Sequence, residues 1–340
     1  TVYGSSQTAG ILRGKEILTM LSITWGDKMK NSLKSLVLLF FLLLLVQFVF
    51  SEEKKPFKPR FSLKLTAGLG SALPIGDVND CLESFNNNEV FEAHREYETG
   101  QVVGEIKTLD TRIFHGEAEL RFDLTPRISF GIATSPPIHK RNESSVTYTI
   151  LGWAGPQVMT WTFRPEIKVS YPIRLSAYYT LPLIRRLSIS IGGGVGFCSA
   201  KIEQFGRYYA IYPLGDTGWV NASQVAKRNF ALGFHGGVAF EKYIFTNRLS
   251  LIAEFQARYI NIRGLKGTHK KTNEAGNHFE TRGTLYYFTW WDHLIGARYA
   301  SIEVHESPPD AGCRYTADIR KAVLNLSGYS FRIGIRIRLF

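Results

Sequence analysis

The last stretch of the chain, Ser327–Phe340 with the sequence SGYSFRIGIRIRLF, decides the fold. Its odd-numbered residues from 329 to 339 are tyrosine, phenylalanine, isoleucine and leucine. Its even-numbered residues from 330 to 338 are serine, glycine and three arginines. Because successive side chains of a strand point to opposite faces, this alternation predicts a β-strand with one apolar face and one basic face.

Seven earlier segments alternate in the same way. They lie at about 61–69, 115–124, 128–133, 163–181, 187–200, 230–241 and 249–262. The connections after the second, fourth and sixth strands are short, and those after the first, third, fifth and seventh are long. This is typical of an all-β, antiparallel, up-and-down transmembrane barrel with short periplasmic turns and long extracellular loops. Pro172 interrupts the fourth strand, where we expect a local bulge because proline lacks a ladder donor.

Two alternatives to an eight-stranded membrane barrel remain at this point. A soluble barrel or β-sandwich would show the same period with its apolar face turned inward. Glycines on the polar faces and charges at strand centres favour the membrane barrel, because eight strands leave little interior space. The aromatic run in the last long loop permits two extra strands, and therefore ten. A hairpin extension is expected at 146–151 in the second loop.

The N-terminal region predicts export. A basic start at 29–34 precedes an almost uninterrupted apolar run at 36–50, and Ser51 follows a small-residue pattern. This is the form of a secretory signal peptide, which we place at 29–51. Residues 1–28 show no periodicity, and we expect them to be mistranslated upstream sequence. We therefore divide the chain into 1–28, the signal peptide at 29–51, a periplasmic lead-in at 52–60 and the barrel at 61–340.

Composition narrows the classes of function. The 340 residues carry a net charge of +12, but the basic residues are spread along the chain, which does not favour a nucleic-acid partner. There are three cysteines and no CxxC motif, so neither a metal site nor a cofactor is indicated. Cys81 and Cys313 fall in the first and last long loops, which rise side by side if the barrel closes. In an oxidising compartment we expect these two to form a disulfide and Cys198 to stay free, and the alternative is that all three cysteines are unpaired.

The C-terminal residues resemble the assembly signal of bacterial outer-membrane β-barrels. The positions that carry the resemblance are Arg332, Gly334, Ile337, Leu339 and the terminal Phe340. With the strand pattern, the chain resembles the small eight-stranded outer-membrane barrels of the OmpA, OmpX and OmpW type. The resemblance implies a location in the cell outer membrane, insertion by the outer-membrane assembly machinery, contact with lipid and lipopolysaccharide, a monomeric state and no enzymatic activity.

The polar faces of the predicted strands place many charges in the interior. The candidates for a lumen charge network are Lys64, Glu117, Glu119, Arg121, Asp123, Lys168, Arg174, Glu254, Arg258, Arg332 and Arg336, accompanied by Glu166, Glu241 and Arg338. Buried charges must be paired, so a salt-bridge plug is the favoured interpretation. The alternative is a narrow channel or transporter for small, including hydrophobic, solutes.

Two further features suggest other functions. His235 and Glu254 both point inward, which invites comparison with barrel enzymes that deacylate lipid A, but the position expected for the serine nucleophile is Gly237. In the last loop, an aromatic run offers a possible surface for binding. Its members are Tyr286, Tyr287, Phe288, Trp290 and Trp291. A hairpin packed on its own aromatics is the competing interpretation of this run.

We therefore predict a non-enzymatic outer-membrane barrel with a role in envelope structure or surface interaction. Transport of small solutes is the second hypothesis, and a lipid A-modifying enzyme is the third.

Overall fold

The computed structural model describes residues 58–72, 75–95, 101–152, 155–184, 186–244, 248–292, 297–310 and 316–339. The predicted leader at 1–28 and the signal peptide at 29–51 lie outside these residues. So do most of the lead-in, Cys313 and Phe340.

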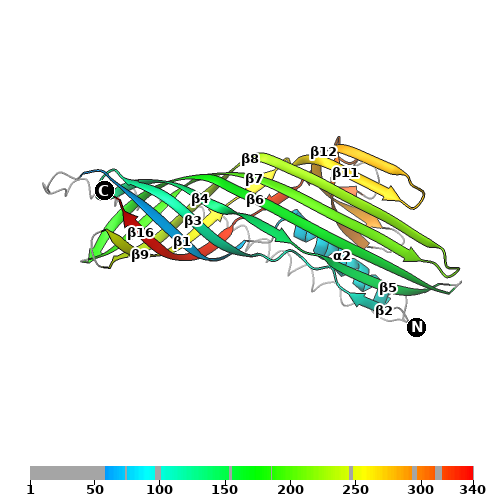
Figure 1. Ribbon diagram of the computed structural model, residues 1–340. Helices are drawn as coiled ribbons and strands as arrows, with labels where there is room; N and C mark the ends of the chain where they lie inside the picture. The colour runs from blue at the N-terminus through cyan, green and yellow to red at the C-terminus, as the bar shows by residue number, and fades with distance from the viewer. Residues whose placement is uncertain are drawn as a thin grey trace, which may run out of the picture. The chain divides into compact units, whose positions relative to one another are not determined.

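Eight antiparallel strands form a closed hydrogen-bonded ring (Figure 1). In ring order they are β1 (Arg60–Ala72), β3 (Arg112–Asp123), β4 (Ile128–Arg141), β6 (Gly155–Ile184), β7 (Leu187–Ile211), β8 (Thr217–Tyr243), β9 (Leu249–Tyr259) and β16 (Gly328–Arg338). The first strand pairs with the last, with Leu65 opposite Ile335. The predicted order and antiparallel pairing of the eight strands are confirmed.

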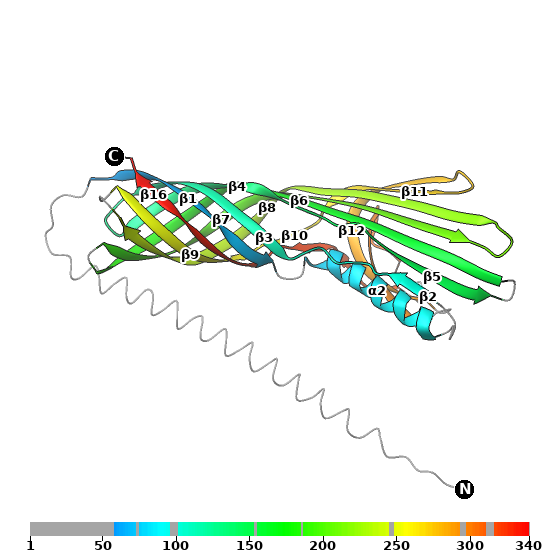
Figure 2. The ribbon, with the colours of Figure 1, turned by 60° about the horizontal axis from the view of Figure 1, so that its bottom comes forward.

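The predicted long loops are largely ordered secondary structure, which we call the extension. It comprises α2 (Asp77–Arg95), β2 (Gln101–Gly104), β5 (Ser144–Gly152), β10 (Asn261–Arg263), β11 (Lys266–Asn273), β12 (His278–Asp292), β13 (Ala297–His305), β14 (Thr316–Lys321), β15 (Val323–Asn325) and the distal parts of β6, β7 and β8 at 155–170, 200–211 and 217–230. Figure 2 shows β6, β7 and β8 continuing beyond the ring into this part. The hairpin expected at 146–151 is present as β5 paired with β6.

The ten-stranded alternative is wrong for the described ring. β11 pairs with the distal part of β8 and β12 pairs with β11, so these strands widen the sheet outside the ring. They do not enter between two ring strands. The pairing of β8 with β9 ends at the Phe234–Tyr259 pair, and the same edge of β8 pairs with β11 in its distal part.

The interior changes from polar to apolar where the ring meets the extension. On β6, the even residues Ser176 and Tyr178 are buried in the ring, whereas the odd residues Ile167 and Val169 are buried in the extension. The register with β7 shifts between Ser170 and Ile173, at the proline where a bulge was predicted. A bulge inserts one residue, so it reverses which parity faces inward.

Helix α2 lies in the first of the predicted long loops and is the one α-helix among the described residues of this all-β chain. Val78, Cys81, Leu82 and Phe85 have the i, i+3, i+4, i+7 spacing of one helix face. Leu82 is 1% exposed, and the Phe85 ring lies 4.8 Å from that of Phe163 on distal β6. Helix α2 therefore seals the apolar core of the extension. Among the described residues, no helix is long and apolar enough to cross a membrane.

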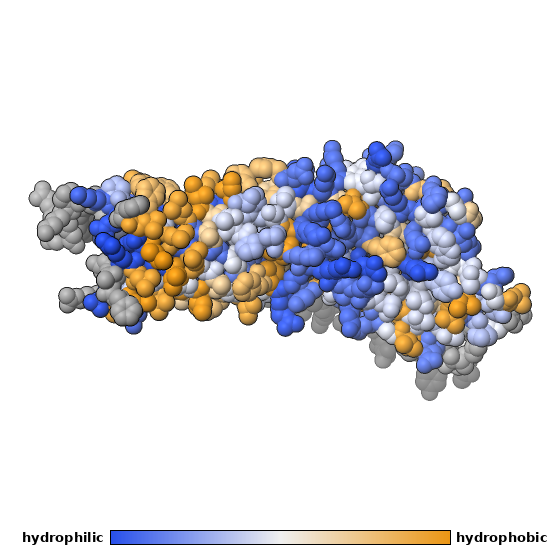
Figure 3. All heavy atoms as spheres, viewed as in Figure 1, coloured by the Kyte–Doolittle hydropathy of each residue, from blue (hydrophilic) through white to orange (hydrophobic). Residues whose placement is uncertain are grey.

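The outer surface of the ring is apolar. Leu69, Phe114 and Ile333 are 70%, 68% and 61% exposed, and they belong to three different ring strands. In Figure 3 the hydrophobic residues gather over the ring, and hydrophilic residues dominate beside it. The ring thus has an apolar exterior and a charged interior, whereas the extension has the ordinary arrangement with an apolar core.

Candidate functional site

The interior of the ring holds two adjacent clusters of ion pairs, which together we call the plug. Five cations and five carboxylates form it: Lys64, Arg121, Arg174, Arg332, Arg336, Glu117, Glu119, Asp123, Glu241 and Glu254. Their strands are β1, β3, β6, β8, β9 and β16. Strand alternation places these side chains inside the ring. On β3, for example, the four alternate residues from 117 to 123 are all charged and share the inner face.

Lys64 lies at the centre of the plug and is 2% exposed. Its Nζ lies 2.5 Å from Glu119 Oε2, 3.1 Å from Glu254 Oε2 and 3.5 Å from Glu117 Oε1. Three carboxylates around one ammonium are balanced by Arg332, whose Nη2 lies 2.6 Å from Glu254 Oε1 and whose Nη1 contacts Glu117. Arg174 also contacts Glu117.

A second layer surrounds Arg336. Its Nη1 lies 3.0 Å from Glu241 Oε2, its Nη2 lies 2.6 Å from Asp123 Oδ1, and its Nε donates to Ser62 Oγ at 2.8 Å. Arg121 donates to Ser129 Oγ at 2.7 Å. Each guanidinium thus has several acceptors, which the burial of a charge requires.

Tyr178 joins the two layers. Its hydroxyl donates to Glu119 Oε2 at 3.0 Å, and the Arg121 guanidinium lies 4.2 Å from its ring centroid. Glycines on the neighbouring strands leave room for these groups: a Cβ at Gly192 would overlap the Tyr178 ring, and one at Gly131 would overlap the Glu119 carboxylate. The plug is therefore closely packed against the wall of the ring at these two glycines.

The structure does not bring Lys168 into the plug. Its Nζ lies 2.5 Å from Glu166 Oε1, and the Lys168 side chain is 50% exposed. Both residues are in the distal part of β6, beyond the bulge that reverses parity, so their side chains point out of the extension. The prediction that these two charges face the lumen is wrong for this reason. Arg338, at the opposite end of the ring, donates to the Tyr243 hydroxyl.

Arg258 is inside the ring but stands apart from the ion pairs. Its Nε donates to the Leu326 carbonyl at 2.9 Å, and its Nη1 donates to His115 Nδ1 at 3.2 Å. Within the described part of the chain, no carboxylate lies within ion-pair distance of this guanidinium. The prediction that Arg258 belongs to the charge network is therefore corrected.

Near this position, His235 contacts a serine that the sequence did not indicate. His235 Nε2 lies 2.9 Å from Ser176 Oγ. The two residues belong to β8 and β6, and both lie opposite Gly194 of the intervening strand β7, where no side chain separates them. In the described residues, no carboxylate is hydrogen-bonded to His235 as the third member of a triad.

The aromatic run on β12 is mostly packed inside the extension. Tyr286 is 7% exposed, Tyr287 stacks under Arg320, Phe288 packs edge-on against His305 and Trp290 stacks on Tyr299 at 4.8 Å. Only Trp291 of the five candidates is exposed, at 38%. These five residues therefore do not form a contiguous exposed aromatic surface, because four of them pack against other side chains.

The predicted disulfide is not formed by Cys81. This residue is on α2, is 8% exposed and is a free thiol, and Cys313 lies outside the described residues. The cysteine faces the apolar core with the rest of the helix stripe, so it does not point towards a loop. Cys198 is a free thiol as predicted, and its Sγ donates to the Ala231 carbonyl at 3.4 Å.

The residues of the predicted assembly signal are divided between the two faces of β16. Arg332 is in the plug and Gly334 lies opposite Thr66 on β1. Ile337 and Leu339 are on the outside, 37% and 44% exposed. The terminal Phe340 lies outside the described residues, and the signal itself stays a prediction.

Comparison with known proteins gives only distant similarities. No protein-family model matches the chain, and no curated protein matches it. A major outer membrane protein from Thermus thermophilus is similar with a TM-score of 0.30 and 14% identity, over 83% of this chain and 100% of that one. The outer membrane protease OmpT from Escherichia coli is similar with a TM-score of 0.25 and 9% identity, over 85% of this chain and 99% of that one.

Proposed function

We propose that this protein is a β-barrel of the bacterial outer membrane, with a non-enzymatic role in envelope structure or surface interaction. The observation that carries the proposal is the reversal of polarity along the sheet. The ring has apolar side chains outside and paired charges inside, as a protein in lipid requires, whereas the extension has an apolar core, as a protein in water requires.

The dimensions of the ring support this assignment. β9 and β16 have 11 residues each and β3 has 12, close to the roughly 9–11 residues with which a tilted strand crosses a bilayer. The short connections lie at one end and the extension at the other. In outer-membrane barrels short turns face the periplasm, so the extension is assigned to the cell exterior.

Surface labelling of intact cells tests location and orientation together. Lys271 on β11 and Lys242 at the short-turn end of β8 are both exposed lysines. A membrane-impermeant amine reagent is expected to modify Lys271 in intact cells and Lys242 only after the outer membrane is permeabilised. Modification of Lys242 alone in intact cells, or recovery of the protein outside the outer-membrane fraction, contradicts the proposal.

The plug supports a structural role over a channel. Ten charged groups with balanced charge occupy the ring interior, and moving ions past them requires breaking buried pairs. In a planar bilayer we expect no discrete openings from the purified protein. Reproducible single-channel steps would favour the transport hypothesis. Against an enzymatic role, the Ser176 side chain is buried and its histidine has no carboxylate partner in the described part of the chain.

A further inference from the structure

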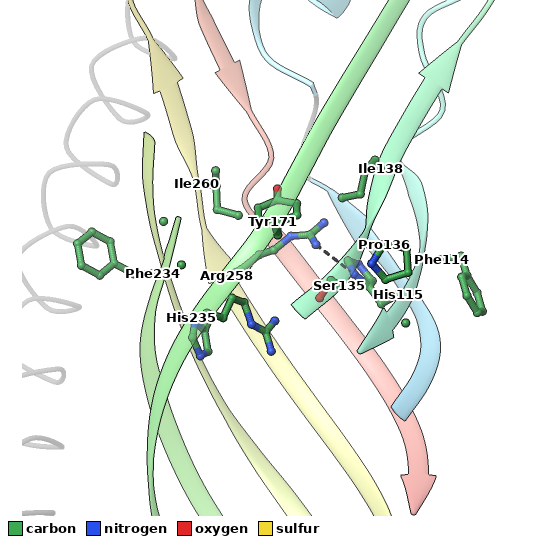
Figure 4. Close-up of a pocket in the computed structure, with 14 residues that line it drawn as sticks. Phe114, His115, Ser135, Pro136, Ile138, Tyr171, Phe234, His235, Arg258 and Ile260 are labelled. Atoms are coloured by element: carbon green, nitrogen blue, oxygen red, sulfur yellow. Dashed lines mark hydrogen bonds between the residues drawn. The ribbon is translucent and has the colours of Figure 1, made fainter. Parts of the chain in front are cut away.

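A pocket lies inside the ring at its junction with the extension, between the plug and the apolar core. Figure 4 shows that Arg258, His115 and Tyr171 reach it from β9, β3 and β6, with a hydrogen bond joining the first two. Arg174 also lines it, so the pocket borders directly on the plug.

Four buried polar atoms of the residues that line this pocket have no hydrogen-bond partner. They are His115 Nε2, Tyr171 Oη, Arg174 Nε and Arg258 Nη2. An arginine can only donate, so His115 Nδ1 must accept from Arg258, and the His115 proton is then on Nε2. All four atoms are therefore able to donate. A buried donor without an acceptor is costly, and four around one pocket call for a group rich in acceptors.

The charge of the pocket indicates an anion. The plug is neutral, with five cations and five carboxylates, so it leaves no carboxylate for Arg258. A buried guanidinium without a counter-charge is unfavourable, and an anion beside it would supply one. Carboxylates and phosphates match the planar donor geometry of arginine.

The hydrogen-bonded ladder of the ring is interrupted on one side of this pocket. The β3–β4 ladder ends at the Ala118–Thr134 pair, and beyond it β4 pairs only with β6. Pro136 and Pro137 follow directly and have no N–H for a ladder, which explains why it ends there. We call the stretch without a backbone ladder, between 112–117 and 135–141, the seam. Among these described residues, only side chains bridge it: Gly116 lies beside the Pro136 ring, and Lys140 Nζ donates to the Arg112 carbonyl.

We propose that the pocket binds an anionic group of the carboxylate or phosphate type, either as a free ion or as the head group of an amphiphile that enters through the seam. The donors of His115, Tyr171, Arg174 and Arg258 hold its oxygens, and its charge neutralises Arg258. The binding site is independent of the proposed role in the envelope, because the ring residues that form it are in place wherever the protein is located.

Calorimetric titration of the full chain, folded in detergent micelles and free of other anions, tests the site with inorganic phosphate and with dodecyl phosphate. We expect binding of at least one probe at one site. Arg258→Gln is expected to weaken it at least about tenfold, because a charge-assisted contact is lost. The matched control is Arg263→Gln, an exposed arginine on nearby β10, which should bind as the wild type does.

Tyr171→Phe keeps the proposal testable if Arg258→Gln does not fold. It removes a hydroxyl that has no partner in the protein, so it breaks no existing hydrogen bond, yet it should weaken binding several-fold. Equal affinity in wild type, Arg258→Gln and Tyr171→Phe overturns the proposal. Failure of both probes to bind the wild type also overturns it.

The two probes distinguish the source of the anion. Much tighter binding of dodecyl phosphate than of phosphate, with both weakened by Arg258→Gln, identifies an amphiphile whose tail lies in the seam. Equal affinities identify a free anion. Dodecanol controls for the tail: binding of dodecanol as tightly as dodecyl phosphate, insensitive to Arg258→Gln, overturns the anion site.

Discussion

Single buried charges control the stability of the ring. Arg332 is 1% exposed and is the direct partner of both Glu117 and Glu254. Replacing a well-packed buried pair as a whole is often tolerated, but removing one member leaves an uncompensated charge in a site that water does not reach. The plug is therefore more sensitive to single changes than to paired ones.

Arg332→Met is expected to destabilise the folded protein by about 3–5 kcal/mol, because it leaves excess negative charge in the plug. Urea titration in detergent micelles measures the change in the free energy of unfolding. The double variant Arg332→Met/Glu117→Gln should recover part of the loss, as coupled neighbours do. The control is Arg282→Met, which removes an exposed pair with Glu280 and should have no measurable effect. A single variant as stable as the wild type contradicts the plug.

Gly131→Ala is expected to cost about 1–3 kcal/mol, because the added methyl group would overlap the Glu119 carboxylate and displace it from Lys64. Gly236→Ala is the matched control in the same ring. The Cβ of that residue would lie 3.6 Å from the nearest heavy atom, which is ordinary contact. The same unfolding assay checks both variants, and equal losses would show that the packing around Glu119 is not tight.

Burial raises the pKa of the Cys81 thiol to about 12. The thiolate is the reactive form, so in the folded protein its fraction is very small at pH 8 and still small at pH 10. We expect a maleimide to modify Cys81 only after unfolding, as peptide mass mapping would reveal. Modification of the folded protein at the rate of a free peptide thiol contradicts the buried position of this helix face.

Polar side chains near its N-terminus fix helix α2 to the rest of the extension. Asp77, in the first turn of α2, accepts two hydrogen bonds from Arg320 on β14 and one of 2.7 Å from the Val323 backbone N–H of β15. Asn79 exchanges hydrogen bonds with the Leu109 backbone in both directions. The helix is thereby anchored to three separate segments at its N-terminal end.

Asp77→Ala is expected to loosen α2 without opening the ring. Losing a buried carboxylate with three donors costs about 1–3 kcal/mol, which corresponds to roughly tenfold or faster amide exchange in the helix. Hydrogen-exchange mass spectrometry resolves α2 from the ring strands. Asp216→Ala, at the exposed turn between β7 and β8, is the control. Equal acceleration in β1 and β16 would mean that the helix and the ring unfold together.

At the scale of the whole molecule, the ring could be predicted because its signal is local. From Tyr329 to Leu339 the even residues are small or basic and the odd residues are apolar, so parity alone separated the two faces of the strand. The extension could not be predicted in this way. Its strands carry few clean alternations, and the bulge near Pro172 reverses the parity of Lys168 relative to Arg174.

Helix α2 and the pocket were missed for different reasons. The helix stripe from Val78 to Phe85 was present in the sequence but was obscured by the following Asn86-Asn87-Asn88. The separation of Arg258 from the carboxylates has no sequence signal, because it depends on which of the ten charged plug residues, on six strands, pair with one another in the folded ring. The seam has one signal in the sequence, the pair Pro136-Pro137, which cannot donate to a ladder. This pair lies in a segment that the sequence pattern predicts to be a loop.

Quenching of tryptophan fluorescence by lipids tests the central claim, that the ring spans a bilayer, most directly. The described tryptophans, Trp161, Trp219, Trp290 and Trp291, all belong to the extension. Phe331→Trp adds one on the outer face of β16, and Phe279→Trp adds one at a comparably exposed position on β12. In vesicles with acyl chains brominated near their middle, the added emission of Phe331→Trp should be strongly quenched and that of Phe279→Trp should not. Equal quenching of the two variants, or an unquenched Phe331→Trp, would contradict a membrane-spanning ring.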